Sequence, residues 1–391
     1  MRVFFVREKL MQVEVQETWW IKKRDELLQI ADQHLNAYVY DLQTVEQSVR
    51  EVLSMHAVSR VLYAMKANFN EDVLRTLANA GADFDCVSPG EVKHLRKVLP
   101  NDGRNRILFT PNFAPRDEYE WGIREGLRVT LDNLYPLKAW PEIFRGQELF
   151  IRIDPAMGGG HHEHVVTVGT RSKFGVSLDE LDELDRLVKR AAVTVTGIHA
   201  HSGSGILDPE NWHSVADVLL DVAERFPDVK VLDLGGGMGV PDRRDEPSFD
   251  LRALDQRLTE FRKRNSNYEL WLEPGRYLVA VAGVLLTHLT QFKGKAEMRY
   301  VGVSTGINSL IRPALYDAYH EIYNLTRIDE EATEMVTIVG PICETGDKLG
   351  RDRLFPPSKE NDVVLIANAG AYGRVTSSNY NLRDLPPEIA I

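Results

Sequence analysis

The feature that most constrains this chain is a regular alternation of strand-like and helix-like runs between residues 36 and 277. Short runs rich in β-branched and aromatic residues are followed by amphipathic segments, a pattern typical of βα units and a parallel sheet. Eight βα units in about 240 residues predict an α/β protein with a (β/α)8 TIM barrel, whose chemistry lies at the carboxyl ends of its strands. The eight strand-like runs end at Tyr63-Ala64, Phe84-Asp85-Cys86, Leu108-Phe109-Thr110, Val129-Thr130-Leu131, Phe150-Ile151-Arg152, Ile198-His199-Ala200, Leu232-Asp233-Leu234 and Trp271-Leu272-Glu273.

Helix starts are recognisable between these runs. Ser88-Pro89-Gly90-Glu91 offers an N-cap, a proline at the first helical position and a glutamate that closes a capping box. Ser177 to Val188 places leucines at helical spacing after an acidic first turn. Both segments are predicted to be helices that cover the barrel.

The pattern changes after Glu273, where strand-like segments follow one another with little helix between them. We therefore predict a barrel domain over residues 36–277 and a second, β-rich domain over residues 278–391. Residues 1–35 begin with a strand-like run and continue as a helix, and we expect this lead-in to pack with the β-rich domain. The strand-like segments after the barrel are Val279 to Thr290, Met298 to Val303, Met335 to Val339 and Asp362 to Ala367.

Charge and cysteine content limit the possible partners. A formal net charge of -11 disfavours nucleic acid and anionic membranes, which reward clustered lysine and arginine. The longest apolar run, Tyr277 to Leu289, is shorter than the roughly 20 residues that a membrane helix needs. Cys86 and Cys343 are too few for a disulfide framework, which fits a reducing compartment, and the N-terminus is charged too early for a signal peptide. We expect a cytoplasmic protein that acts on a small molecule.

Lys66 follows the first barrel strand in the stretch Tyr63-Ala64-Met65-Lys66-Ala67-Asn68. An amine at a barrel mouth can lose its charge through desolvation or a nearby cation and become a nucleophile towards an aldehyde cofactor. The alternative is an ordinary solvated lysine, which this stretch alone does not exclude.

Two histidines, His199 and His201, lie on one face at the end of the sixth strand. Alternate histidines in a strand could bind zinc, but no cysteine or acidic residue is close in sequence, and we predict no metal. An imidazole stacked on a planar ring, with Ser204 donating to a phosphate, fits the glycine-rich turn better. The stretch His161 to His164 looks like a metal cluster but follows three glycines, so it is interpreted as a solvated loop.

The seventh and eighth strands end in groups suited to anions. Gly235, Gly236 and Gly237 expose backbone N–H groups that could cradle a phosphate, although a glycine run could equally be a tight turn. Glu273-Pro274-Gly275-Arg276 places a carboxylate and a guanidinium around a glycine, and Arg276 could bind a phosphate or a substrate carboxylate. A surface ion pair is the alternative, but the position at the eighth strand end favours a functional role.

Three segments of the β-rich domain also carry reactive or polar groups. They are Gly340 to Asp347 with Cys343 and Glu344, Arg312 to Tyr316, and Ala369 to Gly373 with Tyr372. Each is ambiguous when taken alone, since a single cysteine is more often a buried, inert residue.

Six ordered motifs give the chain a resemblance that runs over nearly its whole length. They are YAMKAN, HAHSGSG, LDLGGGMG, EPGRY, GPICETGD and ANAGAYG. With them the chain resembles the fold-type III, alanine-racemase-like pyridoxal-phosphate decarboxylases. Within that group it is most similar to diaminopimelate decarboxylases, in particular to the decarboxylase half of chains fused to an aspartate kinase.

The resemblance implies a role for each motif and pyridoxal 5'-phosphate as the cofactor. Lys66 would bond to the cofactor, His201 would stack on its ring, and Glu273 would pair with its pyridine nitrogen. Cys343 would reprotonate the decarboxylated carbon, and Cys343 and Glu344 would reach the active site of the partner subunit of a homodimer. The implied phosphate and cofactor contacts are Ser204, Gly235, Gly236, Gly237, Gly275, Arg276 and Tyr372, and the implied substrate contacts are Arg276, Arg312, Tyr316, Glu344 and Tyr372.

The implied activity is the decarboxylation of meso-2,6-diaminopimelate to L-lysine and carbon dioxide. Glu273 favours decarboxylation over racemisation, because racemases of this fold place a weaker partner at the pyridine nitrogen. Two positions depart from the family pattern: Ser304 stands where an aspartate is usual, and Thr345 replaces a serine. The alternatives are a decarboxylase of ornithine, lysine, carboxynorspermidine or a siderophore precursor and, from another class, a non-catalytic pyridoxal-phosphate carrier.

Overall fold

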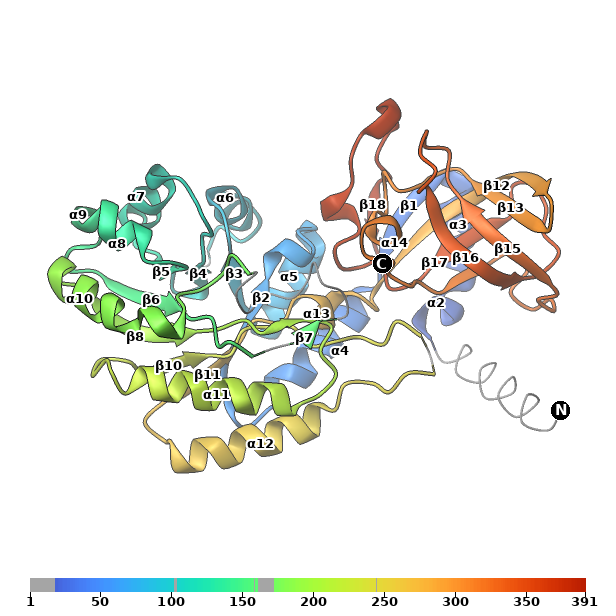
Figure 1. Ribbon diagram of the computed structural model, residues 1–391. Helices are drawn as coiled ribbons and strands as arrows, with labels where there is room; N and C mark the ends of the chain where they lie inside the picture. Colours follow the sequence, from blue (N-terminus) through green and yellow to red (C-terminus); the bar gives the residue numbers. More distant parts are fainter. Residues whose placement is uncertain (1–17, 102–103, 158, 161–171, 244) are drawn as a thin grey trace. The chain divides into compact units, whose positions relative to one another are not determined.

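The computed structural model describes residues 18–101, 104–157, 159–160, 172–243 and 245–391 (Figure 1). The described chain divides into two compact units. The barrel unit comprises residues 46–240 and 248–278, and the β-rich unit comprises residues 18–45, 241–247 and 279–391 within the described chain. The predicted loop at His161 to His164 and the predicted strand at the very N-terminus lie outside the described residues.

The barrel unit contains a closed barrel of eight parallel strands, so the predicted fold class is confirmed. Each predicted strand end is the end of a real strand or lies within two residues of it. The order around the barrel is β10-β11-β2-β3-β4-β5-β6-β8, which follows the order of the chain. The strands are β2 (Val58–Ala64), β3 (Asp83–Cys86), β4 (Ile107–Phe109), β5 (Arg128–Leu131), β6 (Glu148–Arg152), β8 (Thr194–His199), β10 (Val231–Asp233) and β11 (Glu269–Leu272).

A layer of apolar side chains from these strands forms one buried core cluster. Its members are Leu62, Leu108, Phe150, Val231 and Trp271. Four of the five come from alternate strands, as expected for the packed interior of a (β/α)8 barrel. The barrel is therefore a solid core, and its polar residues are left to the strand ends.

The helices of this part of the chain begin at the predicted capping residues. Ser88 Oγ accepts from the Glu91 N–H, but the Glu91 carboxylate accepts from the Val87 N–H, one residue before the N-cap. Ser177 and Glu180 form the full capping box, and a single 3-10 turn precedes α10. The helices are α4 (Leu42–Leu53), α5 (Glu71–Ala80), α6 (Pro89–Val98), α7 (Arg116–Arg124), α8 (Tyr135–Ala139), α9 (Pro141–Phe144), α10 (Leu181–Ala191), α11 (Glu210–Ala223), α12 (Leu251–Arg264) and α13 (Arg276–Val279).

The β-rich unit is built on an eight-stranded sheet in which β1 and β18 join beside the main path β14-β17-β12-β13-β15-β16. The predicted strands correspond to β12, β13, β15 and β17, whereas β14, β16 and β18 were not predicted. The strands are β1 (Asn36–Tyr40), β12 (Gly283–Lys295), β13 (Met298–Val303), β14 (Ile322–Asn324), β15 (Glu334–Val339), β16 (Lys348–Phe355), β17 (Val363–Ile366) and β18 (Glu388–Ala390).

The predicted boundary at residue 36 needs correction. Strand β1 pairs antiparallel with β12, from Asn36 opposite Thr287 to Tyr40 opposite Gly283, and so belongs to the β-rich sheet. Residues 241–247, predicted as barrel, also group with the β-rich unit. Alternation of strand and helix marks a strand but does not say which sheet accepts it, so this choice is made by tertiary pairing.

The described part of the lead-in forms α2 (Trp19–Lys22) and α3 (Arg24–Gln33). Trp20, Leu27 and Ala31 belong to the same buried cluster as Val284 and Leu286 of β12. Within the described chain, no helix combines the length and the apolar character needed to span a membrane.

Candidate active site

The carboxyl ends of the eight barrel strands carry a ring of polar residues. Neighbouring ends are joined by backbone hydrogen bonds, including Ala200 N–H to Asp233 O at 2.9 Å and Glu273 N–H to Gly235 O at 2.9 Å. The ring consists of Lys66, Asp85, Thr110, Asp132, Arg152, His199 with His201, Asp233 with the glycine turn, and Glu273. The predicted site residues thus lie beside four other polar residues at the predicted strand ends, Asp85, Asp132, Arg152 and Asp233. No function was predicted for these four residues.

Lys66 lies in the 3-10 turn Met65–Ala67 that directly follows β2. The turn is braced from behind, because the Tyr63 hydroxyl donates to the Asn68 carbonyl at 2.9 Å. The Ala64 N–H also donates to the Pro274 carbonyl, so the end of β2 is tied to the loop after β11. The lysine is therefore held at the mouth by ordered backbone on both sides.

Asp85 is the charged partner of Lys66. Its Oδ2 lies 3.1 Å from Lys66 Nζ, and its other oxygen accepts a short hydrogen bond from the Thr110 hydroxyl. Burial raises the pKa of Asp85, while attraction to Lys66 opposes that rise. A partly exposed amine and a buried carboxyl group in such close contact can exchange a proton, which the reactive amine of a Schiff-base enzyme needs.

His201 follows β8 and is oriented by the glycine turn after β10. The Gly236 N–H donates to His201 Nδ1 at 3.3 Å. Burial and the positive charges of Arg152 and Lys66 lower the pKa of His201 to about 3, so its ring is neutral at physiological pH. A neutral imidazole in a fixed orientation suits stacking on a planar ring. Ser204 lies close by in sequence, in the short strand β9 (Gly203–Ser204), which pairs with β7 (Gly159–Gly160).

The turn Gly235-Gly236-Gly237 needs glycine at every position. A Cβ on Gly236 would lie 2.1 Å from the Glu273 carbonyl oxygen, and Cβ atoms on Gly235 and Gly237 would each lie 2.4 Å from a backbone oxygen. Gly235 and Gly237 also have φ angles of +66° and +98°, which favour glycine. Three loops thus meet backbone to backbone here, and a side chain at any of the three positions would push them apart.

Glu273 is buried at the end of β11, with 5% of its surface exposed. Its Oε2 lies 3.1 Å from Nε2 of His199, which is also buried. Burial by itself would raise the pKa of Glu273, but the attraction of His199, Lys66 and His201 lowers it below its usual range. Glu273 is therefore an anion inside the barrel mouth. Gly275 and Arg276 follow it, and Arg276 begins α13.

Arg152, the last residue of β6, is the largest cation of the ring. Its Nη1 lies 3.2 Å from Asp132 Oδ1, and Asp132 also accepts from the Gly175 N–H. Arg152 raises the positive potential that acts on His201. Placement of an arginine at a strand end was the only sequence signal that could have identified it.

In the β-rich unit, Arg312 and Tyr372 lie on segments joined through Ser309. The Ser309 carbonyl accepts from the Tyr38 hydroxyl at 2.5 Å and from the Ser377 hydroxyl at 2.9 Å. Arg312 is 3% exposed and begins α14 (Arg312–Tyr316), which ends at Tyr316. Tyr372 has a φ of +55°, a strained conformation for a residue other than glycine.

Cys343 and Glu344 lie in an exposed loop after β15, so the thiol is not the buried, inert kind. The C-terminal segment holds this loop, since the Cys343 N–H donates to Asn381 Oδ1 at 2.9 Å and the Tyr380 hydroxyl donates to Glu344 Oε1 at 2.6 Å. The sequence did not indicate Tyr380 or Asn381, because the contact joins segments 36 to 38 residues apart.

Asp347 fixes the other side of the same loop. Its carboxylate accepts from the Ile307 N–H at 2.8 Å and the Ile342 N–H at 2.7 Å. Ser304, which departs from the family pattern, has a defined role in the sheet: its hydroxyl contacts Asn36 Oδ1 at 2.7 Å and Thr287 Oγ1 at 2.9 Å. Ser304 therefore links β13 to β1 and β12.

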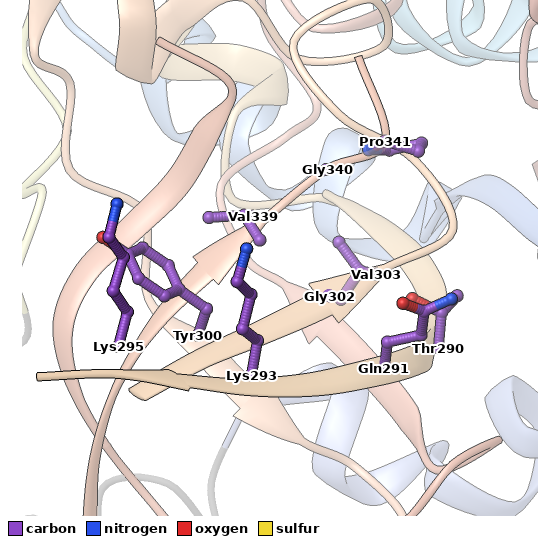
Figure 2. A pocket seen from close by; sticks show the side chains of 10 residues that line it. All are labelled: Thr290, Gln291, Lys293, Lys295, Tyr300, Gly302, Val303, Val339, Gly340 and Pro341. Carbon is purple, nitrogen blue, oxygen red and sulfur yellow. The ribbon is translucent and has the colours of Figure 1, made fainter. Parts of the chain in front are cut away.

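A groove of about 490 Å³ lies over β12, β13 and β15 (Figure 2). Lys293, Lys295 and Tyr300 extend from the same face of these strands. The groove is lined by none of the predicted site residues, although its edge at Gly340 and Pro341 leads into the Cys343 loop. The predicted chemistry thus centres on the barrel mouth and not on this groove.

Comparison with known proteins identifies the class of this site. A family model described as "Pyridoxal-dependent decarboxylase, pyridoxal binding domain" matches residues 42–280, which include every barrel strand. The barrel unit is therefore the pyridoxal binding domain of a pyridoxal-dependent decarboxylase.

The relatives narrow the class further. The chain is 36% identical over 381 residues to the diaminopimelate decarboxylase of Methanothermobacter thermautotrophicus, with 93% of this chain and 88% of the relative covered. It therefore belongs to the diaminopimelate decarboxylase family.

Solved structures agree with this assignment. The diaminopimelate decarboxylase of Helicobacter pylori complexed with L-lysine superposes with a TM-score of 0.84 at 28% identity, covering 94% of this chain and 93% of that one. Lysine decarboxylase of Selenomonas ruminantium superposes with a TM-score of 0.82, covering 94% and 95%. At 24% identity, that second likeness shows the fold alone.

Proposed function

We propose that this chain catalyses the pyridoxal-phosphate-dependent decarboxylation of meso-2,6-diaminopimelate to L-lysine and carbon dioxide. The observation that carries the proposal is the buried, ionised Glu273 at the mouth of a barrel whose chain belongs to the diaminopimelate decarboxylase family. The lysine complex of the Helicobacter pylori relative supports the choice of product.

The barrel residues fit each part of pyridoxal 5'-phosphate. The turn Gly235 to Gly237, where only glycine fits between the backbone segments that meet there, is the proposed phosphate contact, with Ser204 and Gly275 as further contacts. His201 offers a neutral, flat ring for stacking, and Lys66 offers an amine for the aldehyde carbon. Tyr372 and Arg276 complete the proposed set of cofactor contacts.

The bound cofactor supplies an electron sink for the pair of electrons left when the carboxylate departs. Glu273 makes that sink effective, because an anion beside a pyridine nitrogen keeps a proton on it. His201 would cover one face of the ring and keep water from it. Asp85 would take or return the proton of Lys66.

Cys343 is the proposed acid that donates a proton to the α-carbon after carbon dioxide has left. The loop that carries Cys343 and Glu344 is exposed and is held by Asn381 and Tyr380. Its thiol and carboxylate are therefore accessible to another subunit. We propose a homodimer in which Cys343 and Glu344 complete the active site of the partner subunit.

Arg276, Arg312, Tyr316, Glu344 and Tyr372 are the proposed substrate contacts. Diaminopimelate carries a second amino acid group at its far end, which calls for an arginine that binds a carboxylate in two places and an acid that binds an amine. Arg312 is buried and fixed by the start of α14, which suits a clamp. The particular similarity to chains fused with an aspartate kinase stays a prediction.

The test is release of carbon dioxide from meso-diaminopimelate by the purified chain with added pyridoxal phosphate. L-lysine should form in equal amount. Release from L-ornithine, L-lysine or a carboxylated polyamine but not from meso-diaminopimelate would instead favour the second decarboxylase reading. A non-catalytic carrier would release none, and the presence of a whole β-rich unit with the Cys343 loop favours an enzyme.

A further inference from the structure

His199 and Asp233 are the last residues of the adjacent strands β8 and β10, and Glu273 directly follows the next strand, β11. Strand β10, with Asp233 as its last residue, pairs with β8 on one side and β11 on the other. The ligand-type atoms of His199, Asp233 and Glu273 all lie within 4.8 Å of one another, and the three residues are at most 5% exposed.

Two carboxyl groups so close together in a buried site cannot both be ionised without a large cost in free energy. Burial and the charge of Glu273 raise the pKa of Asp233 well above its usual range, so Asp233 keeps its proton. The Asp233 Oδ1 accepts from the Gly235 N–H at 3.0 Å, and a carboxyl oxygen of Asp233 lies within 4.8 Å of a carboxyl oxygen of Glu273. A protonated Asp233 thus keeps an acceptor for the glycine turn and carries a proton that a small side-chain movement could offer to Glu273.

His199 provides the opposite kind of support. Its Nε2 lies 3.1 Å from Glu273 Oε2, so His199 is in direct contact with the carboxylate. The other ionisable groups whose electrostatic interactions shift the pKa values in this cluster are Lys66, Asp85, Arg152 and His201. His199 is the basic group whose attraction does most to offset the burial of Glu273.

We propose that His199 and Asp233 are positioning residues for Glu273. Asp233 stays neutral and donates to Glu273, and His199 keeps Glu273 ionised and oriented. This inference rests on the proposed function, in which ionised Glu273 faces the pyridine nitrogen. It assigns to the end of β8 two distinct histidine roles, with His201 for the ring face and His199 for the carboxylate.

The first test uses the cofactor-free protein, so that it does not depend on activity. Glu273 has a folded-state pKa below its usual value, so its contribution to stability is present above about pH 4.5 and is lost as the pH falls. The Tm deficit of His199→Phe should therefore be largest near pH 7 and should narrow below about pH 4.5. His94→Phe, which removes a histidine of the same unit whose Nε2 lies 2.9 Å from the Phe69 carbonyl oxygen, is the control.

The second test uses the enzyme reconstituted with pyridoxal phosphate. His199→Phe should lower kcat/KM by about 10- to 100-fold, the effect of removing the close basic partner of a buried charge. The acidic limb of the pH profile should move to higher pH, because Glu273 then takes up a proton more easily. An unmoved limb together with a Tm deficit that does not vary with pH would show that His199 only fills space and would overturn its role.

Variants of Asp233 test whether its carboxyl group is neutral or ionised. Asp233→Asn keeps a donor for Glu273 and an acceptor for Gly235, so its kcat/KM should stay within about threefold of wild type, whereas Asp233→Ala should lose about 10-fold or more. Equal losses in the two variants would overturn the protonated assignment. A rise in Tm on adding Zn²⁺ that disappears in His199→Phe would also overturn it, because the three residues would then be a metal site.

Failure of this inference differs from failure of the proposed function. If the wild-type enzyme releases no carbon dioxide from meso-diaminopimelate, the function fails while the pH-dependent Tm difference still tests His199. If carbon dioxide is released but His199→Phe and His94→Phe behave alike, the function stands and the inference fails.

Discussion

Lys66 shows how much a single residue depends on its surroundings. It is one of many lysines in the chain, and its side chain is 43% exposed. What distinguishes it is a buried carboxylate, Asp85, 3.1 Å from its amine, and a turn braced by Tyr63. The proposed reactivity of the amine therefore depends on two neighbours, on β2 and β3, and not on the lysine alone.

Replacing Lys66 by Ala should abolish covalent attachment of pyridoxal phosphate. Sodium borohydride should fix the cofactor to Lys66 of the wild-type protein, as read by mass spectrometry of peptides, and the variant should lose the visible absorbance of the lysine-bound cofactor. Lys97→Ala is the control, because Lys97 is 75% exposed and pairs with Glu71 on the helix surface. Trapping at another lysine in wild type would remove Lys66 from its role.

Replacing Cys343 by Ala should slow turnover by about 100-fold or more, since positioned general acids contribute about 10²–10⁴. The affinity for pyridoxal phosphate should change by less than about twofold, because Cys343 lies in the β-rich unit and not in the glycine turn. The matched control is Cys86→Ala, whose thiol is buried with a pKa raised by burial. Unchanged turnover in Cys343→Ala would contradict the acid role.

At the scale of elements, the active mouth is made where strand ends meet loops. The end of β8, the turn after β10 and the end of β11 approach so closely that only glycine fits between them. This close approach also orients His201, which accepts from the Gly236 N–H. The same backbone contacts therefore shape the anion cradle and fix a side chain.

The variant Gly236→Ala should lose both functions of the turn. Its Cβ would lie 2.1 Å from backbone at Glu273, and overpacking of this kind costs about 1–3 kcal/mol. We expect a lower Tm and a cofactor affinity weakened by at least about 10-fold, measured by absorbance titration. Gly294→Ala should do neither, since no atom lies within 4 Å of its added Cβ. Equal behaviour of the two variants would argue against the cradle.

Glu91, which caps α6, should give this part of the barrel a pH-dependent stability. Burial raises its pKa to about 7, so between about pH 4.5 and pH 7 the folded state holds a proton that the unfolded state has released. Stability from this group is full below about pH 4.5 and falls as the pH rises to about 7. Glu91→Gln removes the titration, so its Tm relative to wild type should increase from pH 5 to pH 8. A constant difference over that range would contradict the raised pKa.

At the scale of the whole molecule, the proposed functional residues are divided between the two units. The barrel unit holds Lys66, His201 and Glu273, while the β-rich unit holds Cys343 and Tyr372. If Cys343 serves the partner's site, as proposed, then no subunit is complete by itself. The proposed homodimer is therefore part of the catalytic hypothesis and can be tested as such.

Mixing two inactive variants tests shared sites. Lys66→Ala and Cys343→Ala chains, dissociated and reassociated together, should regain roughly a quarter of wild-type activity, because half of the random dimers are mixed and each mixed dimer has one intact site of two. Each variant treated alone in the same way is the control. No recovery despite mixed dimers seen by native mass spectrometry would place Cys343 in its own subunit's site or outside catalysis.

The sequence by itself determined the barrel and its eight strand ends. Strand-like runs and capped helices at regular intervals are local signals, and in a parallel barrel all of the strand ends lie around one mouth. Lys66, His201 and Glu273 could be chosen for that reason. Four of the strands of the β-rich unit were visible for the same reason, as apolar runs of strand length.

Only the tertiary structure decided what depends on partners distant in the chain. Strand β1 reads as any strand, and its pairing with β12 over some 240 residues of sequence moved it out of the barrel. Asp85 and Asp233 read as ordinary acids until folding buried them beside Lys66 and Glu273. Charge, burial and hydrogen-bond partners are set by packing and not by sequence spacing, so the protonation of the active mouth could be learned only from the fold.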